Sequence, residues 1–127
     1  MTRGSSLLHL DVRADNVLLT EAGVCFTDWP WAATGAPWFD LIAFLPSVAM
    51  QGGPDPESVW RAHPWSRDVD DEAVDALVAA FAGFLTRNAL RPSPPSLPTL
   101  RAFQAAQGVT ARAWLAQRRG WTDALDC

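Results

Sequence analysis

The feature that most constrains the fold of this chain is a pair of short apolar runs, Val17-Leu18-Leu19 and Val24-Cys25-Phe26-Thr27, joined by Thr20-Glu21-Ala22-Gly23. Runs of this length and composition are typical of strands, and a four-residue link that contains glycine is typical of a hairpin. Gly23 can adopt a positive φ in such a turn. The sequence therefore predicts a β-hairpin that folds the chain back, so that the residues on either side of it lie close together.

A polar stretch precedes this hairpin and an aspartate, Asp28, follows it. The stretch is His9-Leu10-Asp11-Val12-Arg13-Ala14-Asp15-Asn16, and it has neither helical nor strand periodicity. A buried core has no use for so many successive polar groups, whereas an active-site loop does. Because the hairpin returns the chain, we expect Asn16 and Asp28 to lie side by side, with Asp11 flanking the same small site.

These side-chain types suit phosphoryl transfer. That reaction needs a group that orients an acceptor hydroxyl and takes its proton, a magnesium ion that bridges the phosphates, and neutralisation of the developing charge. The carboxylate of Asp11 suits the first task. Since Mg²⁺ prefers hard oxygen ligands, the side-chain carbonyl of Asn16 and the carboxylate of Asp28 suit the second.

The pattern resembles the catalytic and metal-binding loops of the aminoglycoside phosphotransferase/choline kinase family, which are relatives of the protein kinases. The resemblance rests on three motifs and covers residues 7–50 closely: His9-x-Asp11-x-x-x-x-Asn16, Asp28-Trp29, and Gly35-x-Pro37-x-x-Asp40-Leu41. It implies a protein-kinase-like C-terminal lobe with a short catalytic-loop hairpin. It also implies transfer of the γ-phosphate of ATP, with Mg²⁺, to a hydroxyl of a small, aminoglycoside-like molecule.

The resemblance implies a role for each motif residue. Asp11 would be the catalytic base, and Asn16 and Asp28 would bind Mg²⁺ and, with it, the nucleotide. Arg13 would steady the transferring phosphate. The alternative, which is equally compatible with the sequence, is that Arg13 only pairs with Asp15 at the surface.

Three further positions near the motif have implied roles. His9 would brace the loop through hydrogen bonds, and Asp40 would cap the following helix and tie the loop down. Leu10 replaces a glycine that is common in the phosphotransferase branch, which reshapes the floor of the pocket.

Helical spacing of apolar residues predicts that the rest of the chain is helical. A buried helix is expected to begin at Asp40, because Asp is a favourable N-cap and the residues after it are apolar on all sides. A helix with acidic residues at its start is expected over 70–88, and another over 99–119. A helical turn fits 56–62. The predicted class is α+β, mostly α-helical, in one domain over 1–127.

Other features of that family are absent from this sequence. All ten basic residues are arginine, so the chain has no phosphate-binding lysine, and it begins almost at the catalytic loop. We therefore expect a partial kinase-like C-lobe that lacks the N-terminal ATP-binding lobe and is inactive alone.

Two alternatives stay open. The chain is a catalytically dead kinase-like fragment that acts as a binding or interaction module, with a separate lobe or a second copy covering its exposed face. Otherwise it is a small helical regulatory protein whose motif is accidental, in which case Asp11, Asn16 and Asp28 should lie far apart.

Composition limits the partners. A net charge of −4 argues against nucleic-acid binding, and no apolar run is long enough to cross a bilayer. The two cysteines, Cys25 and Cys127, form neither a disulfide framework nor a zinc site, and we recognise no signal peptide. We therefore expect a soluble, cytoplasmic protein. Most of its seven tryptophans should be core residues, with Trp29, Trp31 and Trp38 packing near the polar stretch.

Overall fold

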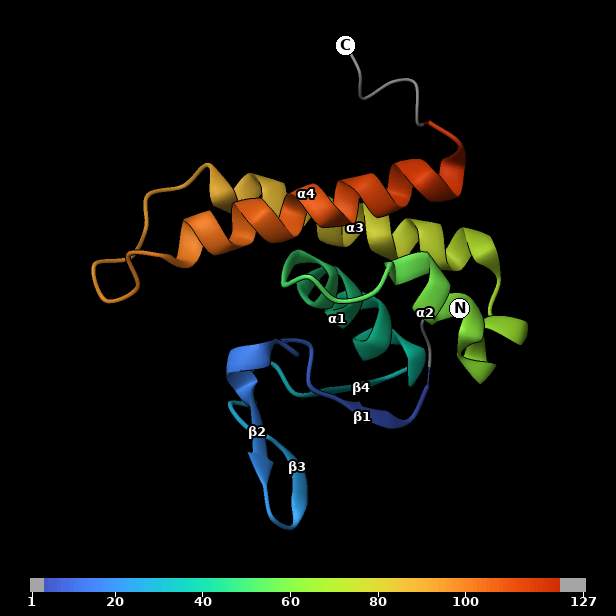
Figure 1. Ribbon diagram of the computed structural model, residues 1–127, viewed down its shortest axis with the longest axis horizontal. Coiled ribbons are helices and arrows are strands. Elements are labelled where there is room, and N and C mark those ends of the chain that lie inside the picture. The colour runs from blue at the N-terminus through green and yellow to red at the C-terminus, as the bar shows by residue number, and fades with distance from the viewer. Residues whose placement is uncertain (1–3, 122–127) are drawn as a thin grey trace.

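The structure is a computed structural model that describes residues 4–121, and these residues are mostly helical with two small antiparallel sheets. The predicted α+β, mainly helical class is confirmed. Helices α3 and α4 lie side by side, α1 lies beneath them, and the strands lie below α1 (Figure 1). In chain order the elements are β1 Ser6–Leu8, the 3₁₀ turn η1 Ala14–Asn16, β2 Val17–Thr20, β3 Gly23–Phe26, β4 Ala33–Gly35, α1 Trp38–Met50, α2 Pro56–Ala62, the 3₁₀ turn η2 Pro64–Arg67, α3 Asp71–Ala89 and α4 Leu100–Arg119.

The predicted hairpin is confirmed as β2 and β3. They pair antiparallel with Val17 opposite Phe26 and Thr20 opposite Gly23. Gly23 has a φ of 127°, and its carbonyl accepts a hydrogen bond from Thr20 Oγ1 at 2.9 Å. The hairpin projects away from the helices (Figure 1), which leaves Leu19 at its tip 83% exposed.

A second strand pair holds the start of the polar loop against the segment that leads into α1. Strand β1 pairs antiparallel with β4, with Ser6 opposite Gly35 and Leu8 opposite Ala33. The backbones approach so closely here that a Cβ on Gly4 would lie 2.4 Å from the carbonyl oxygen of Gly35. The sequence did not predict this pair, because three-residue strands carry too short an alternation to be recognised.

Helix α1 begins at Trp38, so the prediction that Asp40 caps it is wrong. The N-cap position is Pro37, which provides no side-chain cap, and Asp40 lies within the first turn. The predicted helices α2, α3 and α4 are confirmed to within about two residues. Asp70 caps α3 by accepting a hydrogen bond from the backbone N–H of Glu72, as its position before the apolar face suggests.

The main core lies between α1, α2, α3 and α4 and contains three of the seven tryptophans. Trp38, Trp60 and Trp114 are each at most 4% exposed. The other four are at least 36% exposed, so the expectation that most tryptophans are core residues is wrong: Trp29, Trp31, Trp65 and Trp121.

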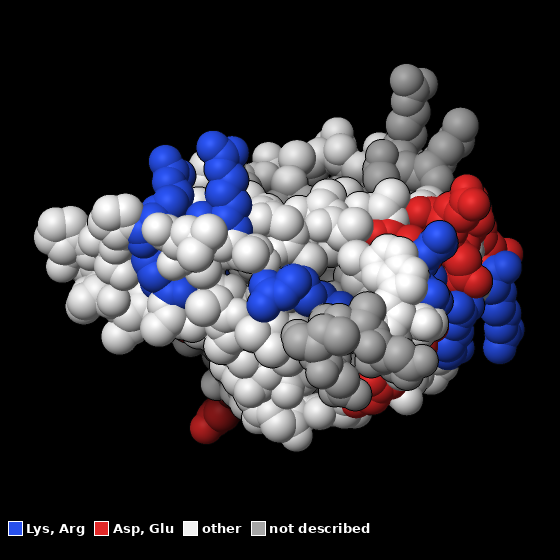
Figure 2. All heavy atoms as spheres, turned by 90° about the horizontal axis from the view of Figure 1, so that it is seen from above, with Lys and Arg blue, Asp and Glu red and all other residues white. Residues whose placement is uncertain are grey.

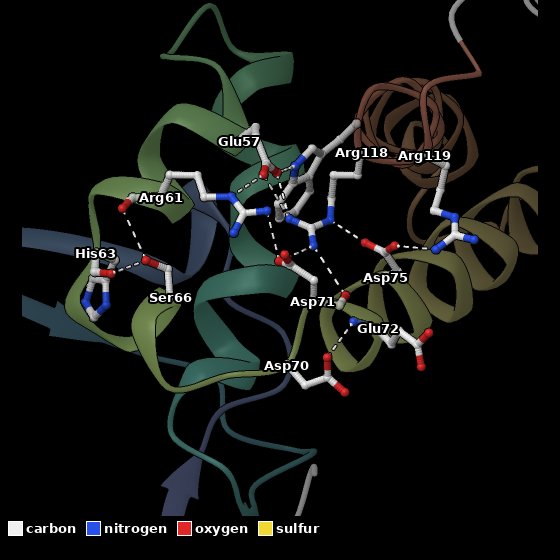
Figure 3. Close-up of polar contacts among 11 residues, drawn as sticks. Glu57, Arg61, His63, Ser66, Asp70, Asp71, Glu72, Asp75, Arg118 and Arg119 are labelled. Carbon is white, nitrogen blue, oxygen red and sulfur yellow. Dashed lines mark hydrogen bonds and ion pairs between the residues drawn. The ribbon is translucent and has the colours of Figure 1, made fainter.

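A buried arginine holds three helices together at one end of the molecule. The side chain of Arg118 in α4 is 2% exposed and pairs with Glu57 of α2 at 2.8 Å, and with Asp71 and Asp75 of α3 at 3.0 and 2.5 Å (Figure 3). Trp114 Nε1 also donates to Glu57, at 2.6 Å. We call these side chains the Arg118 cluster. The cluster fixes α4 against α2 and α3.

Charge is unevenly distributed along the helical pair. Residues 76–121 include six arginines and no acidic residue. On the face shown in Figure 2, most carboxylates gather at one end beside arginines, whereas the opposite end displays arginines. Most of the acidic side chains of α2 and α3 therefore pair with Arg118, at one end of the molecule.

Within residues 4–121, every helix is too short or too polar to cross a membrane. Cys25 is exposed with a free thiol, and Cys127 lies outside the described residues.

Candidate functional site

Asp40 anchors the polar loop to the first turn of α1. Its Oδ2 accepts a hydrogen bond from the backbone N–H of His9 at 2.7 Å, and its Oδ1 accepts one from the N–H of Leu10 at 2.9 Å. Two adjacent backbone donors therefore share one carboxylate. Because α1 is a core helix, this contact fixes the loop relative to the helical body.

The imidazole of His9 connects this loop with the end of the hairpin. His9 is 2% exposed, and its Nε2 lies 2.7 Å from the carbonyl oxygen of Thr27, while its Nδ1 lies 3.2 Å from the backbone nitrogen of Asp11. A carbonyl only accepts and a backbone N–H only donates, so the ring carries its proton on Nε2. The ring also packs against Trp29, with the ring centroids 4.5 Å apart.

Asn16 bridges the predicted base and the end of the hairpin. Its Nδ2 donates to the carbonyl oxygen of Asp11 at 2.9 Å and makes a longer contact of 3.4 Å with Asp11 Oδ2. Its own carbonyl accepts the N–H of Thr27 at 2.9 Å, which places the residue before Asp28 against Asn16. The accidental-motif alternative required Asp11, Asn16 and Asp28 to lie far apart, and the structure instead gathers them at one place.

Two residues of the site have backbone conformations that favour glycine. Leu10 has a φ of 64° and Asp28 a φ of 59°, and among the described residues these are the two non-glycine positions with positive φ. Asp tolerates this region better than Leu, so the strain lies mainly at Leu10. Strained backbone of this kind is typical of functional loops whose surroundings hold them in place.

Arg13 contacts both acidic neighbours. Its Nε lies 3.4 Å from Asp11 Oδ1 and its NH2 lies 3.3 Å from Asp15 Oδ2, while its guanidinium stacks over Phe103 of α4 at 5.5 Å. Both interpretations of Arg13 therefore keep a structural basis. The ion pair with Asp11 is less exposed to solvent than the one with Asp15, because the Asp11 side chain is 30% exposed and that of Asp15 is 62% exposed.

The pKa of Asp11 is raised above the ordinary value of 3.8. Burial is the largest cause, and it is opposed by the charge of Arg13 and reinforced by the charge of Asp15. The negative charge of Asp28 also raises the pKa of Asp11, by a smaller amount, which agrees with its proximity to Asp11. A carboxylate with a raised pKa is a stronger proton acceptor than an ordinary surface aspartate.

The oxygen atoms of Asn16 and Asp28 fit a magnesium ion better than they fit a transition metal. Among residues 4–121, no three His, Cys, Asp or Glu side chains are grouped so that they could hold a metal. Mg²⁺ does not require such a group, because it is usually held by one or two carboxylates together with phosphate oxygens and water. Asn16 directs Nδ2 at Asp11, which leaves its Oδ1 as one candidate ligand, and the exposed carboxylate of Asp28 is the other.

A pocket of about 300 Å³ opens between the polar loop and the helices α3 and α4, and we call it the Asp11 pocket. Sequence reasoning did not find its helical wall, because apolar positions on a helix carry no signal that separates a pocket from a core. The residues that line it are Leu10, Asp11, Val12, Arg13, Trp31, Ala43, Phe81, Phe84, Leu85, Gln104 and Gln107.

Comparison with known proteins finds a partial similarity to small-molecule kinases. The chain is 32% identical over 73 residues to the thiamine kinases of Salmonella typhimurium, Salmonella typhi and Salmonella dublin. In each case the match covers 46% of this chain and 27% of the relative. The match therefore spans only about a quarter of the length of these curated relatives. No protein-family model matches the chain, and no solved structure matches it.

Proposed function

We propose that this chain carries the phosphoryl-transfer site of a small-molecule kinase, which transfers the γ-phosphate of ATP to a hydroxyl group. The observation that carries the proposal is the double attachment of Asn16. Its amide bonds to Asp11, and its backbone carbonyl bonds to the residue before Asp28. The proposed base and the two proposed oxygen ligands then belong to one site, as phosphoryl transfer requires. The partial identity with thiamine kinases supports the same class of reaction.

Asp11 is the group proposed to take the proton. The acceptor oxygen forms a bond to the γ-phosphorus, the bond from that phosphorus to the β–γ bridging oxygen breaks, and ADP leaves. The proton of the acceptor hydroxyl passes to the Asp11 carboxylate, whose raised pKa suits this task. His9 and Asp40 position the loop without touching the reacting atoms.

Asn16 and Asp28 are proposed to hold Mg²⁺ through their side-chain oxygens. When bound, the ion would neutralise negative charge on the phosphates of ATP. Arg13 adds a positive charge next to Asp11, where charge develops on the transferring group.

The relatives suggest which acceptors to test. Thiamine carries a primary hydroxyl on an ethyl chain attached to its thiazolium ring, so it is one candidate acceptor for this chain. An aminoglycoside is the other, on the basis of the motif resemblance alone. The chain contains no lysine to bind the phosphates of ATP, so we expect the chain alone not to turn over ATP. Transfer to any hydroxyl acceptor at a kinase-like rate, about 1 s⁻¹ or more, would overturn this last expectation.

Binding of Mg²⁺-ATP, measured by isothermal titration calorimetry with and without the metal, tests the proposed metal ligands. Asp28→Ala should weaken metal-dependent binding by about tenfold or more, because it removes a ligand. Asp15→Ala is the matched control, since Asp15 is an exposed carboxylate on the same loop that holds no metal in the proposal. Equal affinity of Asp28→Ala and the unaltered chain would refute the metal site.

One observation favours a second candidate function, that of an interaction module. The hairpin exposes Leu19 and Val24, which lie directly opposite each other, at 83% and 59%, and Phe26 on the same face at 47%. Exposed apolar patches on small proteins often mark contact surfaces. In this alternative, Leu19→Ser with Val24→Ser should lower any concentration-dependent association seen by analytical ultracentrifugation and should leave Mg²⁺-ATP binding unchanged.

A further inference from the structure

The end of the helical pair opposite the Arg118 cluster carries a group of exposed arginines (Figure 2). Arg87 lies in the last turn of α3, and Arg91 follows that helix. Arg87 lines one surface hollow together with Arg91, and a second hollow together with Arg112 of α4. All three side chains are exposed. They therefore gather around one place on the surface, which we call the Arg87 patch.

The positive charge of the patch is not neutralised by a carboxylate within residues 4–121. Every ion pair among these residues involves an arginine outside the patch. Arg91 and Arg112 donate hydrogen bonds instead to neutral side chains, those of Asn88 and Thr86. The whole chain has a net charge of −4, so the patch is a local excess of positive charge on an acidic protein. Such an excess attracts an anionic partner.

Large aliphatic side chains lie among these arginines. Leu90 lines the same hollow as Arg87 and Arg112, and it is 84% exposed. Val109 lies three residues before Arg112 on α4, so it is on the same face of that helix, and it is 56% exposed. A surface that combines basic groups with exposed aliphatic groups is typical of proteins that rest on a lipid bilayer, at the boundary between headgroups and acyl chains.

A bilayer uses both kinds of side chain, whereas a nucleic acid uses only one. The phosphates of a nucleic acid attract arginines, but an exposed aliphatic group such as Leu90 gains nothing from a phosphate backbone. At a bilayer surface, each guanidinium can form two parallel hydrogen bonds to a lipid phosphate. The leucine side chain leaves water for hydrocarbon at the same time, which is favourable.

We propose that the Arg87 patch docks this protein on the surface of a membrane that contains anionic phospholipids, with its arginines against the lipid phosphates and Leu90 in the acyl boundary. Docking of this kind is peripheral, so it requires no helix that crosses the membrane. It is weak and reversible, because each basic residue near an anionic surface strengthens binding by only about fivefold. The proposal goes beyond the proposed kinase site and does not depend on it.

Co-sedimentation with lipid vesicles, in the absence of nucleotide and metal, tests the proposal. One set of vesicles consists of phosphatidylcholine alone, and the other contains phosphatidylglycerol as well. At low salt we expect the chain to bind the anionic vesicles at least about tenfold more strongly than the neutral ones. Added salt should release it, because salt screens the attraction. Equal binding to the two kinds of vesicle, or no binding to the anionic ones, would overturn the proposal.

Variants of single arginines then locate the binding. Arg87→Gln should weaken binding to the anionic vesicles by about fivefold, because it removes one charge from the patch. Arg67→Gln is the matched control, since Arg67 is also exposed but lies in η2, outside the patch. Equal weakening by the two variants would show that binding follows net charge alone, and would overturn the proposal. Circular dichroism of both variants checks that the fold is kept.

Leu90→Ser distinguishes a bilayer from other polyanions. The variant keeps every charge, so binding to a DNA duplex, if any, should not change. Binding to the anionic vesicles should weaken by about threefold or more, because the aliphatic group that enters the acyl boundary is lost. Unchanged vesicle binding of Leu90→Ser would contradict the proposal. Tighter binding of the unaltered chain to the duplex than to the vesicles, at equal phosphate concentration, would contradict it as well.

Discussion

The carboxylate of Asp40 accepts the backbone N–H of His9 at 2.7 Å, although the two residues lie 31 positions apart in the chain. The same carboxylate accepts the N–H of Leu10 at 2.9 Å. Both donors belong to the loop that carries Asp11. The position of the proposed base is therefore set by a side chain of the first helix, and not only by the loop itself.

Asp40→Ala should destabilise the chain by about 2–4 kcal/mol, because it leaves two partly buried backbone donors without their charged acceptor. Urea denaturation followed by circular dichroism measures this loss. Asp40→Asn keeps one oxygen acceptor at the same place and should lose about half as much. A free energy of unfolding for Asp40→Ala within about 0.5 kcal/mol of the unaltered chain would show that this contact does not hold the loop.

Leu10 allows a direct measurement of the strain in the loop. Leu10→Ala and Leu10→Gly remove the same side chain beyond Cβ, but Ala keeps a Cβ at a φ of 64° and Gly does not. At an ordinary helix or strand position Gly is the less stable by about 0.5–1 kcal/mol. Here we expect the order to be reversed, with Leu10→Gly about 1 kcal/mol more stable than Leu10→Ala in urea denaturation. If Ala were the more stable of the two, the loop would not hold Leu10 in this conformation.

Local signals in the sequence predicted the hairpin, because the turn and the two apolar runs lie within about a dozen residues. They also predicted the gathering of Asn16 and Asp28, since that follows from the hairpin. The local pattern predicted Asp40 only as a helix N-cap, because a favourable N-cap residue and a residue that bonds to a distant loop look the same in sequence. The expectation that Asp40 ties down the loop came from the family resemblance, and its bonds to the N–H groups of His9 and Leu10 agree with it. Helix α1 starts two residues before Asp40 and releases the carboxylate for the loop.

The burial of Arg118 could not be predicted from the sequence either. Arg118 and Arg119 are adjacent and of the same type, yet their side chains are 2% and 47% exposed. The difference arises from the packing of α4 against α2 and α3, which places acidic residues from two distant segments around one of the two arginines. The pocket wall has the same origin, because Phe84 and Gln107 meet the loop only when α3 and α4 are packed.

Arg118→Ala should destabilise the chain by about 3–5 kcal/mol, because it leaves three carboxylates close together without their buried partner. Arg119→Ala provides the matched control. That side chain is half exposed and, within residues 4–121, forms its one ion pair with Asp75, so the loss should be about 0.2–1 kcal/mol. Similar losses in the two variants, measured by thermal and urea unfolding, would contradict a structural role specific to Arg118.

The same cluster should make the chain sensitive to acid. Burial raises the pKa of Asp71, but hydrogen bonds from Arg118 and Arg61 outweigh this effect and lower the pKa below its ordinary value of 3.8. A carboxyl whose pKa is lowered in the folded state contributes stability above its ordinary pKa and loses it as the pH falls through the folded value. Asp71→Asn should therefore be less stable than the unaltered chain at neutral pH, and this difference in the free energy of unfolding should disappear as the pH falls through the lowered pKa of the folded state.

Asp11 should show the opposite dependence on pH. Burial, only partly offset by Arg13, raises its pKa in the folded state, so the protonated form is the better tolerated. Its stabilising contribution is complete below the ordinary value of 3.8 and is lost as the pH rises through the raised folded value. Asp11→Asn, which resembles the protonated form, should therefore be more stable than the unaltered chain at neutral pH, with the difference disappearing below the ordinary pKa. Urea denaturation across that pH range measures it, and Asp15→Asn is the control on the same loop. A variant that is less stable at neutral pH would mean that the Asp11 carboxylate is stabilised by its neighbours, and would remove the reason to regard it as a strengthened base.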